Sequence, residues 1–419
     1  MPQNGQMNEI TSRYLPLDDA QRRTLHNEVH ARPSARVHLP ALIVYVAVLN
    51  ESITREQEWQ HLRSLPGHAD LTLDKLGGNF LRLRCDGFTV KWERHTEFTR
   101  YAIVQALPAH AAWGAALPEL APHVAVGTAW LRAIPGQTVA AIQLAMLPQG
   151  MQDADLLDKA QVWLGDGAII GSRMGNTSEG QSHSCLLTHL RIGEDGFERM
   201  LVLAPADTAD RRAGRISQRV LELETYRLMA LRGLPVAKQL SPVLAQAEAQ
   251  LADITARLER KESADQDLLD ALVSLAARVE RATAEHGYRF SATRAYDALV
   301  RERIAELRER PLHGTQTVGE FMQRRLSPAM ATVAATAQRL ASLSERVSRT
   351  SALLRTRVDI ATETQNQQLL EKLTKGQTLQ LRLQSTVEGL SIAAISYYVV
   401  SLVLYGAKAL NKLGLPLNP

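Results

Sequence analysis

Two histidines stand four positions apart near the start of the chain, at His26 and His30. Side chains at this spacing share one face of a helix, and such a pair can clamp a divalent metal ion. The ion would need a third ligand from another segment. Ordinary hydrogen-bonded imidazoles on a packed helix face are the simpler interpretation. We group Glu28 and Arg32 with the two histidines as one candidate polar segment.

A second group of ionisable residues lies between Lys91 and Phe98. If this segment is one strand, its two carboxylates and its histidine project from the same face, because side chains alternate along a strand. Carboxylates that flank a histidine can hold a divalent cation or raise the basicity of the imidazole. A polar sheet face with cross-strand pairs is the alternative. The candidate polar site predicted from both segments contains His26, Glu28, His30, Arg32, Glu93, His95 and Glu97, and its candidate metal ligands are His26, His30 and His95.

A series of charged residues lies on a predicted helix between Arg215 and Arg227. Arg219 precedes Glu222 by three residues, and Glu224 precedes Arg227 by three. This spacing is typical of ion pairs on a helix surface, which contribute little stability. An anion site or a lipid-headgroup site is the alternative interpretation of the same helix.

Known catalytic motifs are absent from the sequence. The glycine-rich runs at 165–167 and 171–175 match neither a P-loop nor a dinucleotide fingerprint, and there is no G-x-S-x-G or H-E-x-x-H. No catalytic residue and no cofactor can be assigned on these grounds. The sequence therefore favours a non-enzymatic protein over a hydrolase or metal-dependent enzyme that uses His26, His30 and His95.

The composition excludes several classes of protein. The net charge of +4 is modest, and many arginines lie three or four residues from a carboxylate, so we expect no nucleic-acid partner. Cys85 and Cys185 are far apart and form no C-x-x-C pair, which fits a reducing cytosol. The segment Met1–Ile10 is polar and lacks the apolar stretch of a signal peptide, so we do not expect a cleaved signal peptide there.

Short strand-like and helix-like stretches alternate through residues 1–235, which predicts an α+β cytosolic domain with a largely antiparallel sheet. The apolar, β-branched run Leu42–Leu49 is typical of a buried strand. A tight turn at Asp86-Gly87 predicts a hairpin. Strands are expected at 42–49, 80–84, 88–97, 101–107, 138–147, 185–192 and 197–203, and helices at 18–30, 153–164 and 207–231.

Residues 236–386 carry no strand signals, and their apolar residues recur every three or four positions. This pattern predicts a long-helix bundle or coiled-coil stalk. Ser241-Pro242 is a favourable helix start, and another helix is expected to begin after Pro328. Five apolar residues recur at intervals of seven, namely Val333, Leu340, Val347, Leu354 and Ala361.

The segment Gly389–Ala407 holds 19 residues without a charge. At 1.5 Å per residue it would be about 28 Å long, close to the hydrocarbon thickness of a bilayer. We therefore expect a transmembrane helix over 387–410, and a buried helix of a soluble bundle is the alternative. A small-residue pair and two central tyrosines suggest that this helix packs against other helices; these residues are Gly389, Ala393, Tyr397 and Tyr398.

Six phrases are spread along nearly the whole chain: LHNEVHARP at 25–33, WERHTEF at 92–98, ELETYR at 222–227, RRLSPAM at 324–330, LRTRV at 354–358 and TVEGLS at 386–391. Together they resemble the bacterial family called domain of unknown function 3422. The resemblance implies a membrane anchor and a cytosolic domain, but no activity. It also implies a second apolar helix beyond a Leu-Pro turn, whereas residues 411–419 form only a short tail. A chain truncated before that helix and a single-helix variant are both consistent with this tail.

These observations predict an inner-membrane protein with a cytoplasmic N-terminal domain. Its partners would be the lipid bilayer and further copies of the same chain, in a homo-oligomeric scaffold or regulatory module. The order of domains is also similar to that of CorA-type magnesium channels, although their Gly-Met-Asn loop is missing here. A divalent-cation channel or transporter of that plan is therefore an alternative, which rests on architecture alone.

Overall fold

The computed structural model describes residues 19–30, 33–148, 155–175, 183–260 and 265–412. The chain forms two compact units, the first from Met1–Val243 and Ala282–Leu340 and the second from Leu244–Arg281 and Ala341–Pro419. The helices are α1 (Arg22–His30), α2 (Arg55–Arg63), α3 (Thr128–Arg132), α4 (Leu156–Leu164), α5 (Asp210–Leu231), α6 (Gly233–Arg260), α7 (Asp265–Leu307) and α8 (Val318–Lys412).

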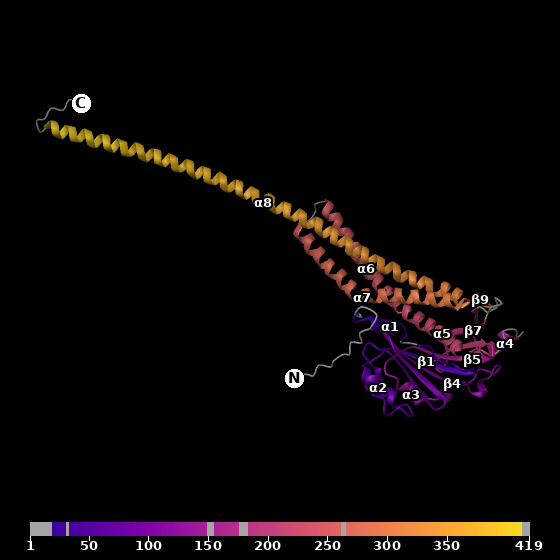
Figure 1. Ribbon diagram of the computed structural model, residues 1–419. Helices are drawn as coiled ribbons and strands as arrows, with labels where there is room; N and C mark the ends of the chain where they lie inside the picture. The colour runs from indigo at the N-terminus through magenta and orange to yellow at the C-terminus, as the bar shows by residue number, and fades with distance from the viewer. Residues whose placement is uncertain (1–18, 31–32, 149–154, 176–182, 261–264, 413–419) are drawn as a thin grey trace, which may run out of the picture. The chain divides into compact units, whose positions relative to one another are not determined.

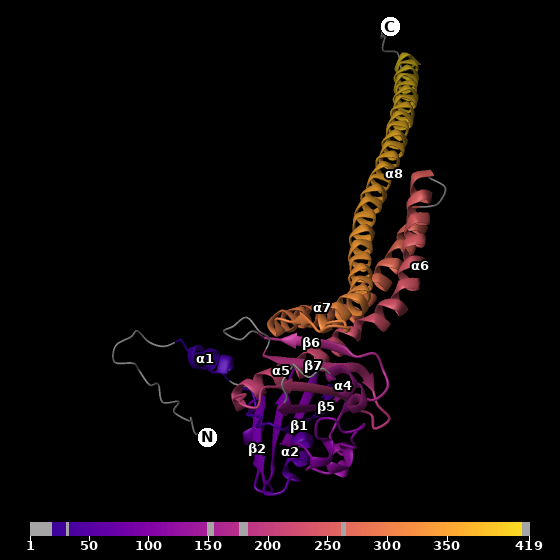
Figure 2. The ribbon, with the colours of Figure 1, turned by 90° about the vertical axis from the view of Figure 1, so that its right-hand side faces the viewer.

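Within the described residues, the first unit contains a nine-stranded sheet, of which β2, β1, β5, β7 and β6 are labelled in Figure 2. The strand order is β2-β3-β4-β1-β5-β8-β7-β6-β9, and all neighbours are antiparallel except β5 and β8. The strands are β1 (Ala41–Leu49), β2 (Phe80–Cys85), β3 (Phe88–Arg94), β4 (Phe98–Ala106), β5 (Gln137–Pro148), β6 (Ile170–Met174), β7 (Ser184–Ile192), β8 (Glu198–Ala204) and β9 (Arg310–Pro311). The predicted α+β class and the largely antiparallel sheet are confirmed.

One face of the sheet packs against α2, α3 and α4. Leu62 of α2, Trp130 of α3 and Trp163 of α4 join a single apolar core with the residues of β1 that point to this side. The opposite face of β1 is also buried, because the chain returns over it as α5 (Figure 1). Burial on both faces explains why β1 is a continuous apolar run rather than an alternating one.

Helix α5 lies very close to the chain segment that precedes β1. A Cβ added to Gly214 would be 1.7 Å from the carbonyl oxygen of Ala35, so only glycine permits this approach. Farther along α5, Thr225 accepts a hydrogen bond of 2.8 Å from Tyr45 of β1, because its own hydroxyl donates to the Leu221 carbonyl. These contacts fix the position of α5 on the sheet.

The strand predicted at 88–97 is shorter in the structure, and so the predicted alternation from Lys91 to Phe98 is wrong beyond Arg94. Strand β3 ends at Arg94 and β4 begins at Phe98. The His95 N–H donates to the Phe98 carbonyl at 2.8 Å, which closes a tight turn between the two strands. Asn50 stabilises this turn by donating to the His95 carbonyl.

Two predicted helix starts are also wrong. Helix α6 begins at Gly233 and contains Pro242, and α8 begins at Val318 and contains Pro328. The start of α8 is set by a capping box: the Thr317 hydroxyl accepts from the Glu320 N–H, and the Glu320 carboxylate accepts from the Thr317 N–H. This reciprocal pair stabilises a start ten residues before the proline.

The second unit consists of helical segments from α6, α7 and α8. Arg357 of α8 donates to the Leu258 carbonyl at the end of α6 and pairs with Asp265 at the start of α7. The seven-residue series on α8 is buried as far as Leu354, and Ala361 is exposed. Helix α8 then continues without a break to Lys412, through a long exposed stretch.

Candidate functional site

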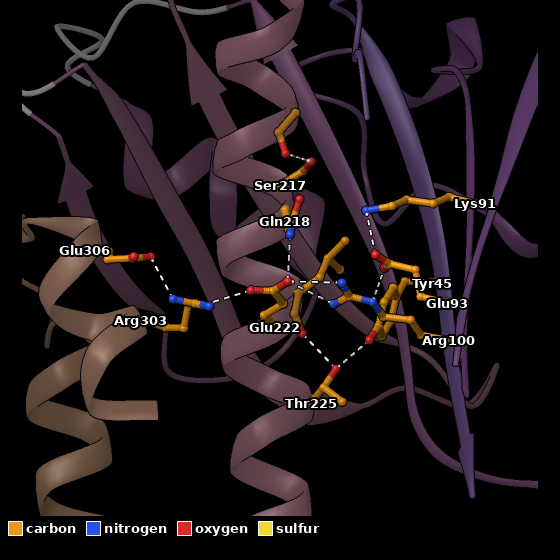
Figure 3. Close-up of polar contacts among 12 residues, drawn as sticks. Tyr45, Lys91, Glu93, Arg100, Ser217, Gln218, Glu222, Thr225, Arg303 and Glu306 are labelled. Atoms are coloured by element: carbon orange, nitrogen blue, oxygen red, sulfur yellow. Dashed lines mark hydrogen bonds and ion pairs between the residues drawn. The ribbon is translucent and has the colours of Figure 1, made fainter. Parts of the chain in front are cut away.

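A cluster of buried charge in the first unit is centred on Arg100 of β4, which is 4% exposed. Its Nε donates to Glu93 on the neighbouring strand β3, and its Nη1 and Nη2 donate to Glu222 of α5 at 3.1 Å each. Figure 3 shows the guanidinium lying between these two carboxylates. Arg100 therefore links the sheet to α5 through charge-assisted hydrogen bonds, which are stronger than neutral ones.

Glu222 is the point where three elements meet. Besides the contact with Arg100, it accepts from Gln218 of α5 at 2.8 Å and from Arg303 of α7 at 2.8 Å (Figure 3). Arg303 also pairs with Glu306, which in turn pairs with Arg219 of α5 at 3.2 Å. The charges alternate in sign along this series, so each carboxylate is neutralised by at least one guanidinium.

The protonation states in the cluster follow from this geometry. Burial alone would raise the pKa of Glu93, but the charges of Arg100 and Lys91 outweigh it and hold that pKa below its usual value. Burial and Arg100 oppose each other in the same way at Glu222, whose pKa is also lowered. Both carboxyl groups are therefore ionised at neutral pH, and they suit a structural network better than proton transfer.

The network encloses little space. A cavity of about 30 Å³ lies between the sheet and α5, beside Tyr45 and Glu93, and this is the volume of roughly one water molecule. Burial raises the pKa of the Tyr45 phenol to about 12, so the hydroxyl stays protonated and donates to Thr225. A space of this size suits a water molecule and not an organic substrate.

The predicted site residues of the WERHTEF segment have different partners. Glu93 belongs to the charge network, whereas His95 lies in the turn and stacks on Phe98 with ring centroids 4.5 Å apart. Glu97 accepts two hydrogen bonds from Arg289 of α7, at 2.7 and 2.8 Å, and lines a pocket of about 390 Å³. The three side chains thus have different bonding or stacking partners, although His95 lies close enough to Glu93 to help lower the pKa of that carboxyl group.

The other predicted site residues lie near the N-terminal end of the described chain. His26 is exposed on α1, and the backbone of Glu28 and His30 belongs to the same helix. Arg32 lies outside the described residues. In the part of the chain that the structure describes, no three His, Cys, Asp or Glu side chains form a group that could hold a metal ion. The histidine metal site stays a prediction.

The predicted surface pairs on α5 divide into one that forms and one that does not. Glu224 pairs with Arg227, but Arg219 pairs with Glu306 of α7 rather than with Glu222. Glu222 and Glu224 are 5% and 1% exposed, so the helix face is buried and not solvated as predicted. The long-range partners Arg100 and Arg303 neutralise Glu222, which a pairing rule based on local spacing does not reveal.

Arg100, Arg303 and Glu306 were not recognised from the sequence. Arg100 lies two residues beyond the WERHTEF phrase, and Glu222 opens the ELETYR phrase. A buried carboxylate in each phrase could have suggested a shared cation. Arg100 is the cation that they share because of the register of β3 and β4, in which Glu93 lies directly opposite Arg100.

The model of the family described as Protein of unknown function (DUF3422) matches residues 18–419. The chain belongs to this family. Comparison with curated proteins and with solved structures finds no match, so the likeness to CorA-type channels has no support.

Proposed function

We propose that this member of the DUF3422 family is an integral inner-membrane protein. In this proposal α8 crosses the bilayer at Gly389–Ala407, and the α+β domain lies in the cytosol. Several copies associate through α8 into a non-enzymatic scaffold or regulatory module. The observation that carries the proposal is the apolar, uncovered end of α8.

Among the described residues, α8 is the one helix that is long and apolar enough to cross a membrane. No residue of its apolar stretch is buried. Exposed large side chains include Leu390, Ile392, Ile395, Tyr397, Tyr398, Val399, Val400, Leu402, Val403, Leu404 and Tyr405. Each leucine, isoleucine or valine among them costs up to about 1.5–3 kcal/mol in water relative to full burial. A bilayer removes this cost, and the helix satisfies its own backbone groups there.

The cytosolic location is supported by the thiols. Cys85 and Cys185 are both free, and burial raises the pKa of Cys185 to about 12, which keeps it an unreactive thiol. Free cysteines are ordinary in a reducing compartment. The buried charge network supports a non-enzymatic role for the domain, since its carboxylates are occupied by cations.

Association of several copies is supported by the part of α8 that precedes the apolar end. Leu369, Leu373, Leu383 and Val387 are 57–62% exposed on a helix that also carries charges, which makes this part unsuited to the bilayer interior. Their spacings of four, ten and four residues place them on one face. In the span, Gly389 and Ala393 permit close approach of a second helix.

Membrane integration is tested by washing membranes with alkaline carbonate. The full chain should stay in the pellet, and the double variant Val399→Arg, Leu402→Arg should move to the supernatant. Each arginine near the centre of a span costs about 2.5–3.5 kcal/mol on insertion scales. The matched control is Gln377→Arg, Gln380→Arg, with the same spacing on the exposed polar part of α8, and it should stay in the pellet. Recovery of the unaltered chain in the supernatant would overturn the membrane proposal.

Self-association is tested by light scattering of the full chain in a mild non-ionic detergent. The protein mass should be at least twice the 46.2 kDa of one chain. Gly389→Leu combined with Ala393→Leu should shift the distribution toward smaller species, because the larger side chains separate the helix backbones. A mass of one chain for the unaltered protein would contradict the oligomeric part of the proposal and leave the membrane part standing.

A further inference from the structure

A pocket of about 530 Å³ lies in the first unit, where β6 and β7 meet α5 and the end of α7. Its volume is within the range of small-molecule sites. The pocket is separate from the small cavity beside Tyr45 and shares only the outermost charges of the buried network. Its polar lining includes Arg212, Arg215, Arg219, Glu306, Arg308 and His183.

The sequence places three of the four arginines on one face of α5. Arg212, Arg215 and Arg219 follow at intervals of three and four residues, so their side chains share one side of the helix. Arg212 lies in the first turn of α5, where the partial positive charge of the helix end favours an anion. The geometry of the helix therefore concentrates positive charge at the pocket.

The fourth arginine comes from a strained position. Arg308 follows the last residue of α7 and has φ of +48°, a left-handed conformation that is uncommon for a residue with a side chain. Such conformations are costly and cluster at functional sites. Here the turn ends α7 and brings a further arginine to the pocket lining.

Among the described residues, few acidic groups balance this positive charge. Arg219 pairs with Glu306, but within the described residues Arg212, Arg215 and Arg308 form no ion pair. Among the described residues that line the pocket, four arginines accompany one carboxylate, that of Glu306, and a second carboxylate, that of Asp207, lies near His183. Burial, and then the nearby Arg212, lower the pKa of His183. This histidine is therefore neutral at neutral pH and does not change the charge of the pocket.

The pocket also contains polar groups without a partner. Ser184 and His183 are 1% and 7% exposed, and in the described part of the chain neither the Ser184 Oγ nor the His183 Nδ1 has a hydrogen-bond partner. Buried polar atoms are usually satisfied by protein, water or a ligand. The remaining walls include the apolar residues Met174, Ile216 and Leu307, which suit an organic group.

We infer that this pocket binds the phosphate of a small organic molecule or of a lipid headgroup. Arginine forks match phosphate oxygens bidentately, and several of them favour a group with more than one negative charge over a single carboxylate. The apolar wall would hold the carbon part of the ligand. The inference does not depend on whether α8 crosses a membrane.

The test uses the full chain in a non-ionic detergent and titrates it with inorganic pyrophosphate in a calorimeter at low salt. Saturable binding with one pyrophosphate per chain is expected. Arg212→Gln and Arg308→Gln should each weaken it at least about tenfold, since a charge-assisted hydrogen bond contributes about 1.5–3 kcal/mol. The matched control is Arg211→Gln, an exposed neighbour on α5 outside the pocket lining, which should change affinity less than about threefold.

Thermal unfolding without ligand separates binding from folding. Arg212→Gln and Arg308→Gln should leave the midpoint unchanged or raise it, because each removes a charge from a like-charged cluster. Absence of saturable binding, or an equal loss of affinity in Arg211→Gln, would overturn the inference.

Competition identifies the source of the phosphate. Stronger displacement by dihexanoyl phosphatidic acid than by glycerol phosphate indicates a lipid headgroup, and the reverse order indicates a soluble organic phosphate; either supports the site.

Discussion

Replacing Arg100 with methionine is expected to lower the free energy of unfolding of the first unit by about 3–5 kcal/mol. The substitution leaves the buried carboxylates of Glu93 and Glu222 without the cation between them, and breaking one partner of a buried ion network has this order of cost. For a domain of this size the thermal midpoint should fall by roughly 6–20 °C. Circular dichroism of the full chain in detergent measures the shift.

The matched control is Arg301→Met on α7. Arg301 also pairs with a carboxylate, that of Asp297, but its side chain is 70% exposed. An exposed pair one helical turn apart contributes about 0.3–0.5 kcal/mol, so its removal should hardly move the midpoint. Equal losses for the two variants would show that burial of the Arg100 network has little energetic consequence.

The dependence on pH gives a second measure of the same network. The folded pKa values of Glu93 and Glu222 lie below their ordinary values, so the unfolded chain binds more protons in acid. Their contribution to stability is therefore present above about pH 4.5 and is lost as the pH falls through the folded pKa values. Arg100→Met should make this loss shallower, because one of the charges that lower both pKa values is gone.

A second large effect is expected from Gly214→Ala. The new Cβ would be 1.7 Å from the backbone oxygen of Ala35, so α5 or the segment before β1 must move. Overpacking of this kind costs about 1–3 kcal/mol of stability and occasionally more. Because the new Cβ meets a backbone oxygen and not a flexible side chain, the cost should be near the upper end of this range. The loss should appear as a lower midpoint of the same transition.

Gly287→Ala on α7 is the control, and its expected change in stability has the opposite sign. Apart from the flanking residues and the helix's own backbone, no atom of the described chain lies within 4 Å of the Cβ that would be added there, and the residue is also helical. Alanine is about 1 kcal/mol better than glycine within a helix, so this variant should be stabilised. A lower thermal midpoint for Gly287→Ala, or an unchanged midpoint for Gly214→Ala, would contradict the packing described for α5.

Local patterns predicted much of the fold. Strand β1 was recognised because its apolar, β-branched run is continuous, and the turn at Asp86-Gly87 because its chemistry is local. Helix starts were less predictable, since proline at 242 and 328 is also tolerated inside α6 and α8. The capping box at Thr317 and Glu320 was present in the sequence and would have given the start of α8.

The candidate site was much less predictable than the strands. Glu93 was selected for its place in an alternating strand, whereas its role depends on Arg100 opposite it and on Glu222, which follows Arg100 by 122 residues. Arg303 lies a further 81 residues along the chain. Partners at such distances are chosen by the packing of α5 and α7 on the sheet, and no spacing rule within one element contains that information.

The first unit is completed by residues 282–340, which the ribosome synthesises after the first helices of the second unit. Arg303 closes the network from α7, and Arg310 and Pro311 of β9 extend the sheet beside β6. A nascent chain released only as far as α5 would therefore hold Glu222 without one of its cations and β6 with an open edge. Stable folding of this unit should await synthesis beyond Pro311, after the intervening helices of the second unit have emerged.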